Sequence, residues 1–234
     1  MLIREKLSVQ YDSIMSEITS PPEVQIPIAF ETQMDEMREW ARPLHNKEAE
    51  YHPFEHAESV YDACMWLADR YEEMGHSVDR RSLGFASLGH DIMVNAPLNQ
   101  AFAPGYIFQS YEHRSAFFSA QYLANRGYDY ASVIKPTYDL IVATKNGEPC
   151  NTIEAVIIRM ADIFNTQDFE LFKDRAEAFY SEKCRFDNEQ RTFAEWLPGA
   201  MGYLQGFLDK NLPDWFTQTA LLHINKMLAE HKID

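Results

Sequence analysis

Apolar residues recur at intervals of three and four along nearly every segment of this 234-residue chain. Such spacing places apolar side chains on one face of an α-helix, and the period-two alternation of half-buried strands is nearly absent. The chain is 46% hydrophobic and 13% aromatic, which suits one sizeable hydrophobic core. The pattern therefore predicts an all-α, single-domain protein.

A stretch that contains three prolines, residues 20–27, lies near the N-terminus. Each proline removes a backbone donor and restricts the residue before it, so the interior of this stretch cannot be helical. We therefore expect residues 1–50 to form a helical extension with a proline-containing linker, and residues 51–234 to form the main domain.

Prolines, glycines and polar turns bound the helices expected in the rest of the chain. Residues 95–110 hold two prolines, a glycine and two asparagines, and we expect them to form an irregular loop over a site. The expected helices cover 30–41, 53–75, 80–94, 111–126, 130–144 and 151–180, followed by one or two helices broken near Pro198-Gly199 and at Pro213.

The charge of the chain restricts its partners. With 36 acidic and 21 basic residues the formal net charge is -15, which disfavours binding to nucleic acid. No signal peptide or membrane span is expected, so the sequence predicts a cytoplasmic protein. Its three cysteines are widely spaced and are expected to be buried as small apolar side chains.

Asp162 interrupts an otherwise apolar helix, and a buried carboxylate is costly unless it is paired or bound to a metal ion. Arg159, three residues earlier, offers an ordinary ion pair as the alternative. His56 and His90 lie on the apolar stripes of two other helices, and Asp91 directly follows His90. Either histidine alone is typical of a hydrogen-bonded core residue, but together the four side chains can converge on one divalent ion, with Mn, Fe, Zn, Co, Ni and Mg all open.

Three sequence contexts sharpen this hypothesis. Residues 51–57, Tyr-His-Pro-Phe-Glu-His-Ala, are similar to the YHNxxHA signature, and residues 160–165 resemble the ADxxN stretch of cyclic-nucleotide phosphodiesterases. Residues 112–116 resemble the N-E-x-x-S-A segment of predicted HD phosphohydrolases. With the order His, His-Asp, Asp, residues 51–165 resemble the HD superfamily of metal-dependent phosphohydrolases, which implies a helical bundle of the HD and phosphodiesterase type.

The resemblance implies that the metal ligands are His56, His90, Asp91 and Asp162. It also implies a role for His52 as the acid that protonates the leaving group, although His52 could instead be a helix N-cap before Pro53.

Three further residues are assigned less directly. The resemblance gives Glu112 a catalytic role in holding or deprotonating the metal-bound water, with a solvated helix start as the alternative. His113 could orient a ligand or bind substrate. Lys145 could meet a substrate phosphate, although a lysine at a helix C-terminus is also what the helix dipole favours.

The implied function is hydrolysis of a phosphate ester in a small, nucleotide-like substrate by attack of metal-bound hydroxide. A cyclic-nucleotide phosphodiesterase and a non-catalytic, metal-stabilised HD regulatory domain are the alternatives, and a homodimer remains open. The third histidine of the phosphodiesterase motif is missing, since Val94 stands at its position. Of the two later histidines that HD proteins with a dinuclear centre usually add, only His113 is present, which favours one tightly bound ion. Tyr106, Phe108 and Tyr111 could stack on a base, while residues 204–208 are expected only to pack in the core.

Overall fold

The computed structural model describes residues 29–94, 110–208 and 212–231. Every regular element in these ranges is helical, which confirms the all-α prediction. Three short helical turns, η1 (Arg42–Leu44), η2 (Tyr130–Ile134) and η3 (Phe164–Gln167), join the longer helices. The α-helices are α2 (Phe30–Ala41), α3 (Phe54–Glu73), α4 (Arg80–Gly89), α5 (Tyr111–Asn125), α6 (Lys135–Ala143), α7 (Ile153–Asp162), α8 (Phe169–Phe186), α9 (Phe193–Gln205) and α10 (Asp214–Glu230).

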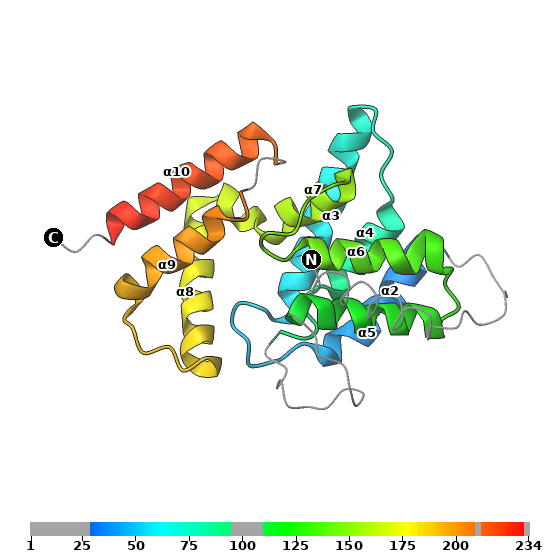
Figure 1. Cartoon of the computed structure of the whole chain (residues 1–234), viewed down its shortest axis with the longest axis horizontal. Coiled ribbons are helices and arrows are strands. Elements are labelled where there is room, and N and C mark those ends of the chain that lie inside the picture. The colour runs from blue at the N-terminus through cyan, green and yellow to red at the C-terminus, as the bar shows by residue number, and fades with distance from the viewer. Residues whose placement is uncertain (1–28, 95–109, 209–211, 232–234) are drawn as a thin grey trace, which may run out of the picture.

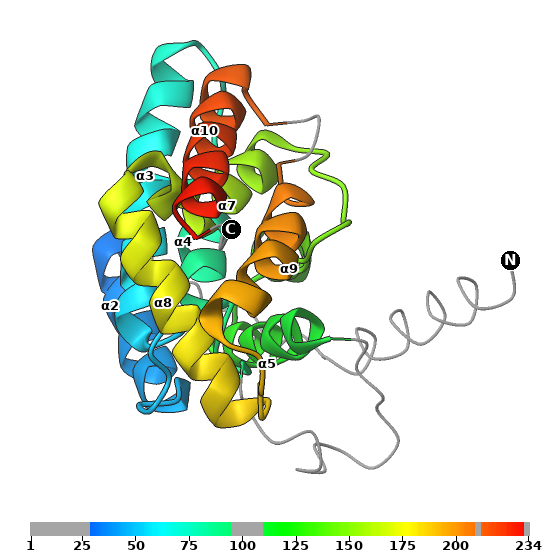
Figure 2. The same cartoon turned by 90° about the vertical axis from the view of Figure 1, so that its left-hand side faces the viewer.

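The helices form two groups that lie side by side (Figures 1 and 2). Helices α2 to α7 make the larger group, in which α3 packs on both α4 and α7 and α5 packs on α6. Helices α8, α9 and α10 make the smaller group, at the left of Figure 1. The turn η3 contacts α8 and α10 and therefore connects the two groups.

Three apolar clusters hold these groups together. The first joins α3, α4, α6 and α7, and Phe207 and Phe216 extend it to the C-terminal helices. The second lies between α2, α3, α4 and α5 and includes the fully buried Phe85. The third and smallest lies between α8, α9 and α10 around Trp196. Burial of these apolar surfaces is the main favourable term in folding.

The helix expected over 80–94 ends earlier, at Gly89, and that boundary was wrong. A side chain at Gly89 would lie 2.4 Å from Ser119 Oγ of α5 and 3.0 Å from Met37 Cε of α2, so this glycine allows three helices to approach closely. His90 is the C-cap of α4, and Asp91 lies in the turn that follows. His90 itself keeps helical dihedrals of φ −66° and ψ −34°, so Asp91 still follows it at about the helical spacing.

The single helix expected over 151–180 was also wrong, because the chain breaks directly after Asp162. Ile163 leaves the helical conformation with φ −109° and ψ 22°, and η3 follows. The carboxylate of Asp168 then accepts a hydrogen bond of 2.9 Å from the backbone N–H of Leu171 and caps the start of α8. Such capping favours a new helix over continuation of the old one.

Other predictions had mixed outcomes. The helices expected over 30–41, 53–75 and 111–126 are confirmed to within two residues at each end. The break expected near Pro198 is wrong, because α9 continues through Pro198, its sixth residue, without the backbone hydrogen bond that the missing N–H would donate. The break at Pro213 is confirmed, since Pro213 precedes α10. Cys64 and Cys150 are buried as expected, but Cys184 is exposed on α8.

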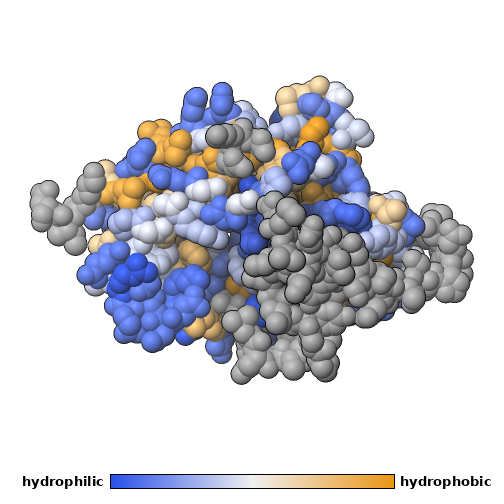
Figure 3. Space-filling view, in the orientation of Figure 1, coloured by the Kyte–Doolittle hydropathy of each residue, from blue (hydrophilic) through white to orange (hydrophobic). Residues whose placement is uncertain are grey.

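The expected N-terminal helix and linker, the expected loop at 95–109, and its Tyr106 and Phe108 lie outside the described residues. Within residues 1–50, α2 packs on α4 and buries Met34 and Met37 in the second apolar cluster, while the expected boundary at residue 50 stays a prediction. Apolar side chains are exposed over α10 in Figure 3. Leu222 of α10 is 65% exposed. Across the described ranges, no helix combines the length and apolarity that crossing a membrane requires.

Candidate metal centre

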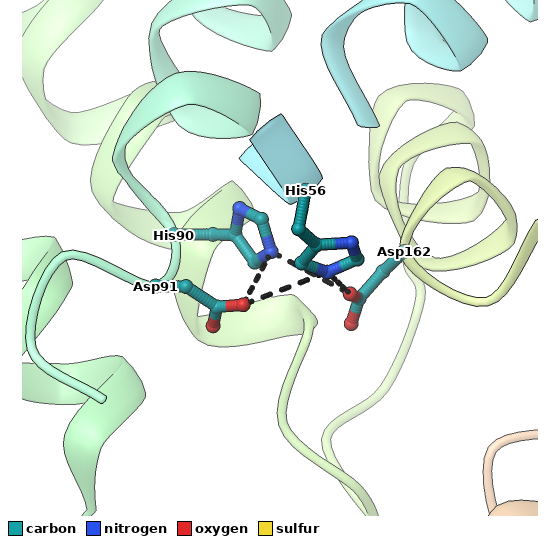
Figure 4. Close-up of side chains that lie close together, drawn as sticks. All are labelled: His56, His90, Asp91 and Asp162. Carbon is teal, nitrogen blue, oxygen red and sulfur yellow. Dashed lines mark hydrogen bonds and ion pairs between the residues drawn. The ribbon is translucent and has the colours of Figure 1, made fainter. Parts of the chain in front are cut away.

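Four side chains that can bind a metal ion meet where three helices end or begin (Figure 4). His56 lies in the first turn of α3, where Pro53 precedes the helix and its carbonyl accepts a hydrogen bond from the His56 backbone N–H. Asp162 is the last residue of α7, and His90 and Asp91 follow α4. All four point toward one another, as the sequence predicted.

The potential ligand atoms, one from each residue, all lie within 4.8 Å of one another. His56 Nε2 is 3.2 Å from Asp162 Oδ1 and 3.6 Å from Asp91 Oδ2. His90 Nε2 is 3.0 Å from Asp91 Oδ2 and 3.5 Å from Asp162 Oδ1. A divalent ion with bonds of about 2.0–2.2 Å to nitrogen and oxygen needs ligand atoms at such mutual distances.

The hydrogen bonds of His90 suit it to a metal ligand. Its Nδ1 lies 2.8 Å from the carbonyl oxygen of Ser87, so Nδ1 donates there and Nε2 is the nitrogen that faces the carboxylates of Asp91 and Asp162. These two carboxylates raise the pKa of His90, so a metal ion would compete with a proton for Nε2.

The alternative explanation of Asp162, an ion pair with Arg159, does not hold. The Arg159 guanidinium is buried and donates to three backbone carbonyls, those of Ala143, Lys145 and Glu148. Asp162 instead faces the two histidines. Arg159 therefore ties α7 to the end of α6 and the turn that follows, and leaves the carboxylate to the cluster.

Mutual charge keeps both carboxyl groups ionised. Burial alone would raise their pKa values, but His90 and His52 lower the pKa of Asp91 to about 2. Hydrogen bonds with His56 and His90 likewise hold the pKa of Asp162 far below its ordinary range. Both side chains are therefore carboxylates at neutral pH, the form that binds metal ions.

The two histidines respond differently to the same surroundings. Burial lowers the pKa of His56, and the neighbouring Asp162 only partly offsets this effect. For His90, burial also acts to lower the pKa, but Asp91 and Asp162 raise it well above its ordinary value. The pair of carboxylates thus attracts positive charge strongly, and the group of four could hold a metal ion.

His52 lies beside this group and has a carboxylate partner. Its Nδ1 is 2.5 Å from Oε1 of Glu182, a residue of α8 that is only 3% exposed. Oε2 of Glu182 accepts backbone N–H bonds of 2.9 and 3.0 Å from Tyr51 and His52. His52 therefore does not cap α3 with its side chain, and its other nitrogen, Nε2, is the one available to a ligand.

Besides Glu182, two arginines of α8 hold the chain segment that carries His52. Arg175 donates to the Tyr51 carbonyl and lies over the Tyr51 ring, 4.1 Å from its centroid. Arg185 donates to the Glu48 carbonyl at 2.7 Å and to the Glu50 carboxylate at 2.6 Å. The position of His52 thus depends on contacts with α8, a helix of the smaller group.

A cleft with an empty volume of about 700 Å³, counting its opening to solvent, runs from the candidate metal centre to α8 and α9. The cavity volume within it is about 90 Å³, which is below the roughly 300–1,000 Å³ of typical small-molecule sites. The cleft is lined by Tyr51, His52, Asp91, Tyr111, Asp162, Ile163, Asn165, Phe172, Ala176, Phe179, Trp196, Ala200, Met201, Tyr203, Leu204 and Phe207. Leu204 and Phe207 were expected only to pack in the core, and they also line the cleft.

The other predicted site residues lie apart from the four. Glu112 is buried at the start of α5, next to the cleft residue Tyr111, but does not itself line the cleft. His113 Nδ1 lies 3.0 Å from Ser110 Oγ, and burial and the charge of Lys145 lower its pKa. Lys145 donates to Glu148 at 3.3 Å. The catalytic and substrate-binding roles of Glu112, His113 and Lys145 stay predictions.

Sequence reasoning missed Glu182 and His45. Glu182 is 130 residues from His52, and nothing in its local sequence distinguishes it from a surface glutamate. His45 is 5% exposed, and in the described structure neither of its ring nitrogens has a hydrogen-bond partner. Burial lowers the pKa of His45 to about 4, against the opposing charge of Asp91, so it is neutral beside the cluster.

Comparisons of the chain with protein-family models, with curated proteins and with solved structures returned no match.

Proposed function

We propose that the chain is a metal-dependent phosphohydrolase of the HD type, which cleaves a phosphate ester of a small molecule. The observation that carries the proposal is the shared cleft. The candidate metal ligands Asp91 and Asp162 and the carboxylate-held His52 line the same cavity. A site for a cation beside a held imidazole is what hydrolysis of a phosphate ester requires.

The four side chains His56, His90, Asp91 and Asp162 would hold the ion. When bound, a divalent ion polarises the phosphoryl oxygen and lowers the pKa of coordinated water to near neutrality. The donor set of two imidazoles and two carboxylates suits Mn, Fe, Zn, Co and Ni, and admits Mg.

His52 serves as the general acid in this proposal. Its Nδ1 is held by the Glu182 carboxylate, which fixes the ring and leaves Nε2 to meet the leaving group. In the reaction water adds to phosphorus, the P–O bond of the ester breaks, and the alcohol leaves with a proton donated by His52. Acid catalysis of this kind contributes roughly 10²–10⁴ in rate.

The charge of the chain does not oppose an anionic substrate at this site. The formal net charge is -15, but a bound divalent ion dominates the local field and inverts its sign within the cleft. Phosphate is therefore attracted locally even though the surface as a whole repels anions.

Metal content and phosphate release, measured together on the purified protein, test the proposal. Wild type is reconstituted with each candidate metal and offered a panel of phosphomonoesters and cyclic nucleotides. Asp91→Ala removes a ligand, and Asp139→Ala, an exposed aspartate of α6 that pairs with Lys135, is the matched control. We expect near-stoichiometric metal and phosphate release in wild type and control, and neither in Asp91→Ala.

Metal bound without turnover of any ester would refute the hydrolase and leave a metal-stabilised regulatory domain. Turnover of cyclic nucleotides alone would identify a phosphodiesterase. Unchanged turnover in Asp91→Ala would exclude the four-residue group as the catalytic centre.

A further inference from the structure

The cleft has two chemically different sides. At one end lie the carboxylates of Asp91 and Asp162 and the imidazole of His52, beside Tyr51, Tyr111, Ile163 and Asn165. The other side is a wall of apolar and aromatic side chains from α8, α9 and the turn after α9, which we call the α8–α9 wall. It consists of Phe172, Ala176, Phe179, Trp196, Ala200, Met201, Tyr203, Leu204 and Phe207.

Among the described residues, no lysine or arginine lines this cleft. Three cationic side chains, Arg114, Lys183 and Arg191, line an adjoining outer groove instead. Of these, Lys183 and Arg191 already form ion pairs of 2.6 Å with Asp187 and Glu189. A chain of several phosphates along the cleft would lie against apolar carbon with no counter-charge beyond the metal centre, which is unfavourable.

The wall does suit a flat ring. Phe179 and Trp196 meet edge to face with centroids 5.7 Å apart, and Tyr203 and Phe207 do so at 5.3 Å. Tyr203 lines both the cleft and the outer groove and remains 51% exposed, so part of its ring is free to cover a ligand. Aromatic side chains bind flat rings through stacked and edge-to-face contacts.

We infer that the α8–α9 wall binds the flat, uncharged ring of the substrate's alcohol. The enzyme then prefers monophosphate esters of ring-containing alcohols to small aliphatic phosphates and to polyphosphates. The inference rests on the proposed function, because the metal centre must hold the phosphoryl group at the charged end of the same cleft.

Three substrates test the preference: 1-naphthyl phosphate, glycerol 3-phosphate and ATP, each with the metal-loaded protein. We expect the dissociation constant of 1-naphthyl phosphate, measured as a competitive inhibitor of glycerol 3-phosphate turnover, to lie about three- to tenfold below the KM for glycerol 3-phosphate, which is the factor that one aromatic contact supplies whatever the acidity of the alcohol. Equal constants for the two esters would overturn the inference and leave the proposed function standing.

Variants of Tyr203 locate the preference on the wall. Its exposure makes Tyr203→Ala compatible with folding. We expect Tyr203→Ala to raise KM for 1-naphthyl phosphate about three- to tenfold and to leave KM for glycerol 3-phosphate unchanged. Tyr203→Phe keeps the ring and should behave as wild type. Trp215→Ala, an aromatic residue of α10 with 52% exposure that does not line the cleft, is the control.

A binding measurement separates failure of this inference from failure of the proposed function. Calorimetric titration with 1-naphthyl phosphate is run on metal-loaded wild type, Tyr203→Ala and Trp215→Ala, whether or not turnover occurs. Weaker binding in Tyr203→Ala alone supports the wall even if no ester is hydrolysed. Equal binding in all three, or no binding, refutes it.

Discussion

Helices α2 to α7 bury two large apolar clusters, whereas α8 to α10 enclose a single smaller one. The larger group supplies all four candidate metal ligands, and the smaller group supplies Glu182 and most of the apolar wall. The buried charges of the candidate metal centre thus lie in the larger group, whose close packing can hold them at fixed distances. The smaller group contributes the partner of His52 and the apolar surface.

The larger group should be the more sensitive to loss of packing. Phe85 of α4 is completely buried in the second apolar cluster, five residues before His90. We expect Phe85→Ala to lower the free energy of unfolding by about 3–5 kcal/mol, because it removes a large buried side chain and leaves a cavity. Urea unfolding measures this change.

Leu222→Ala, at a position of α10 that is 65% exposed, is the control for that experiment and should stay within about 0.5 kcal/mol of wild type. A loss of stability in Leu222→Ala as large as that in Phe85→Ala would mean that the Leu222 side chain is buried in solution. The larger group would then not be the more sensitive to loss of packing.

Removing the charge of Glu182 should separate proton donation by His52 from metal binding by the four candidate ligands. We expect Glu182→Gln to lower kcat about 100-fold, equivalent to about 2.7 kcal/mol, for esters of weakly acidic alcohols, because His52 loses the carboxylate oxygen that fixes its Nδ1 and orients its ring. Metal content should not change. Esters of acidic phenols, which leave without a proton, should lose much less.

Glu177→Gln, an exposed glutamate on the same helix, is the control for Glu182→Gln. A uniform loss for all leaving groups, or a loss of bound metal, would show that Glu182 supports the structure and not proton transfer.

His45 should make the larger group sensitive to acid. Its pKa is lowered to about 4 in the folded chain from an ordinary 6.5, because it is buried. Between these values the unfolded state binds more protons, so this contribution to stability is present above pH 6.5 and lost as the pH falls toward 4. We expect His45→Leu to reduce the pH dependence of the unfolding free energy in this window by up to one proton. The same slope in both proteins would contradict a buried, neutral His45.

The smallest effect is expected at the exposed junction between the groups. Arg185 of α8 donates to the Glu48 carbonyl and pairs with Glu50, and both charged side chains are partly exposed. Exposed ion pairs contribute little, so Arg185→Ala should cost less than about 1 kcal/mol in thermal unfolding. A larger loss would show that α8 is held mainly by this contact and less by its apolar cluster.

Several features were predictable because their signals are local. Proline and the period of apolar residues placed α2 and α3 to within two residues, and burial on apolar stripes indicated that His56 and His90 converge with Asp91 and Asp162. These signals lie in short stretches of the chain.

Other features were not predictable because they depend on distant contacts. Gly89 lies where α5 and α2 approach α4 closely, and α9 continues through Pro198. The partner of His52 lies 130 residues away on α8, and no local pattern marks Glu182 as buried. Tertiary packing decides such positions, and propensity does not.

Anomalous diffraction from crystals of the protein soaked with Mn²⁺ or Zn²⁺ tests the central claim most directly. The account predicts one strong peak between His56 Nε2, His90 Nε2 and the carboxylates of Asp91 and Asp162, about 2.0–2.2 Å from its ligands. A peak bound elsewhere, or none at this position with the metal in excess, would contradict it.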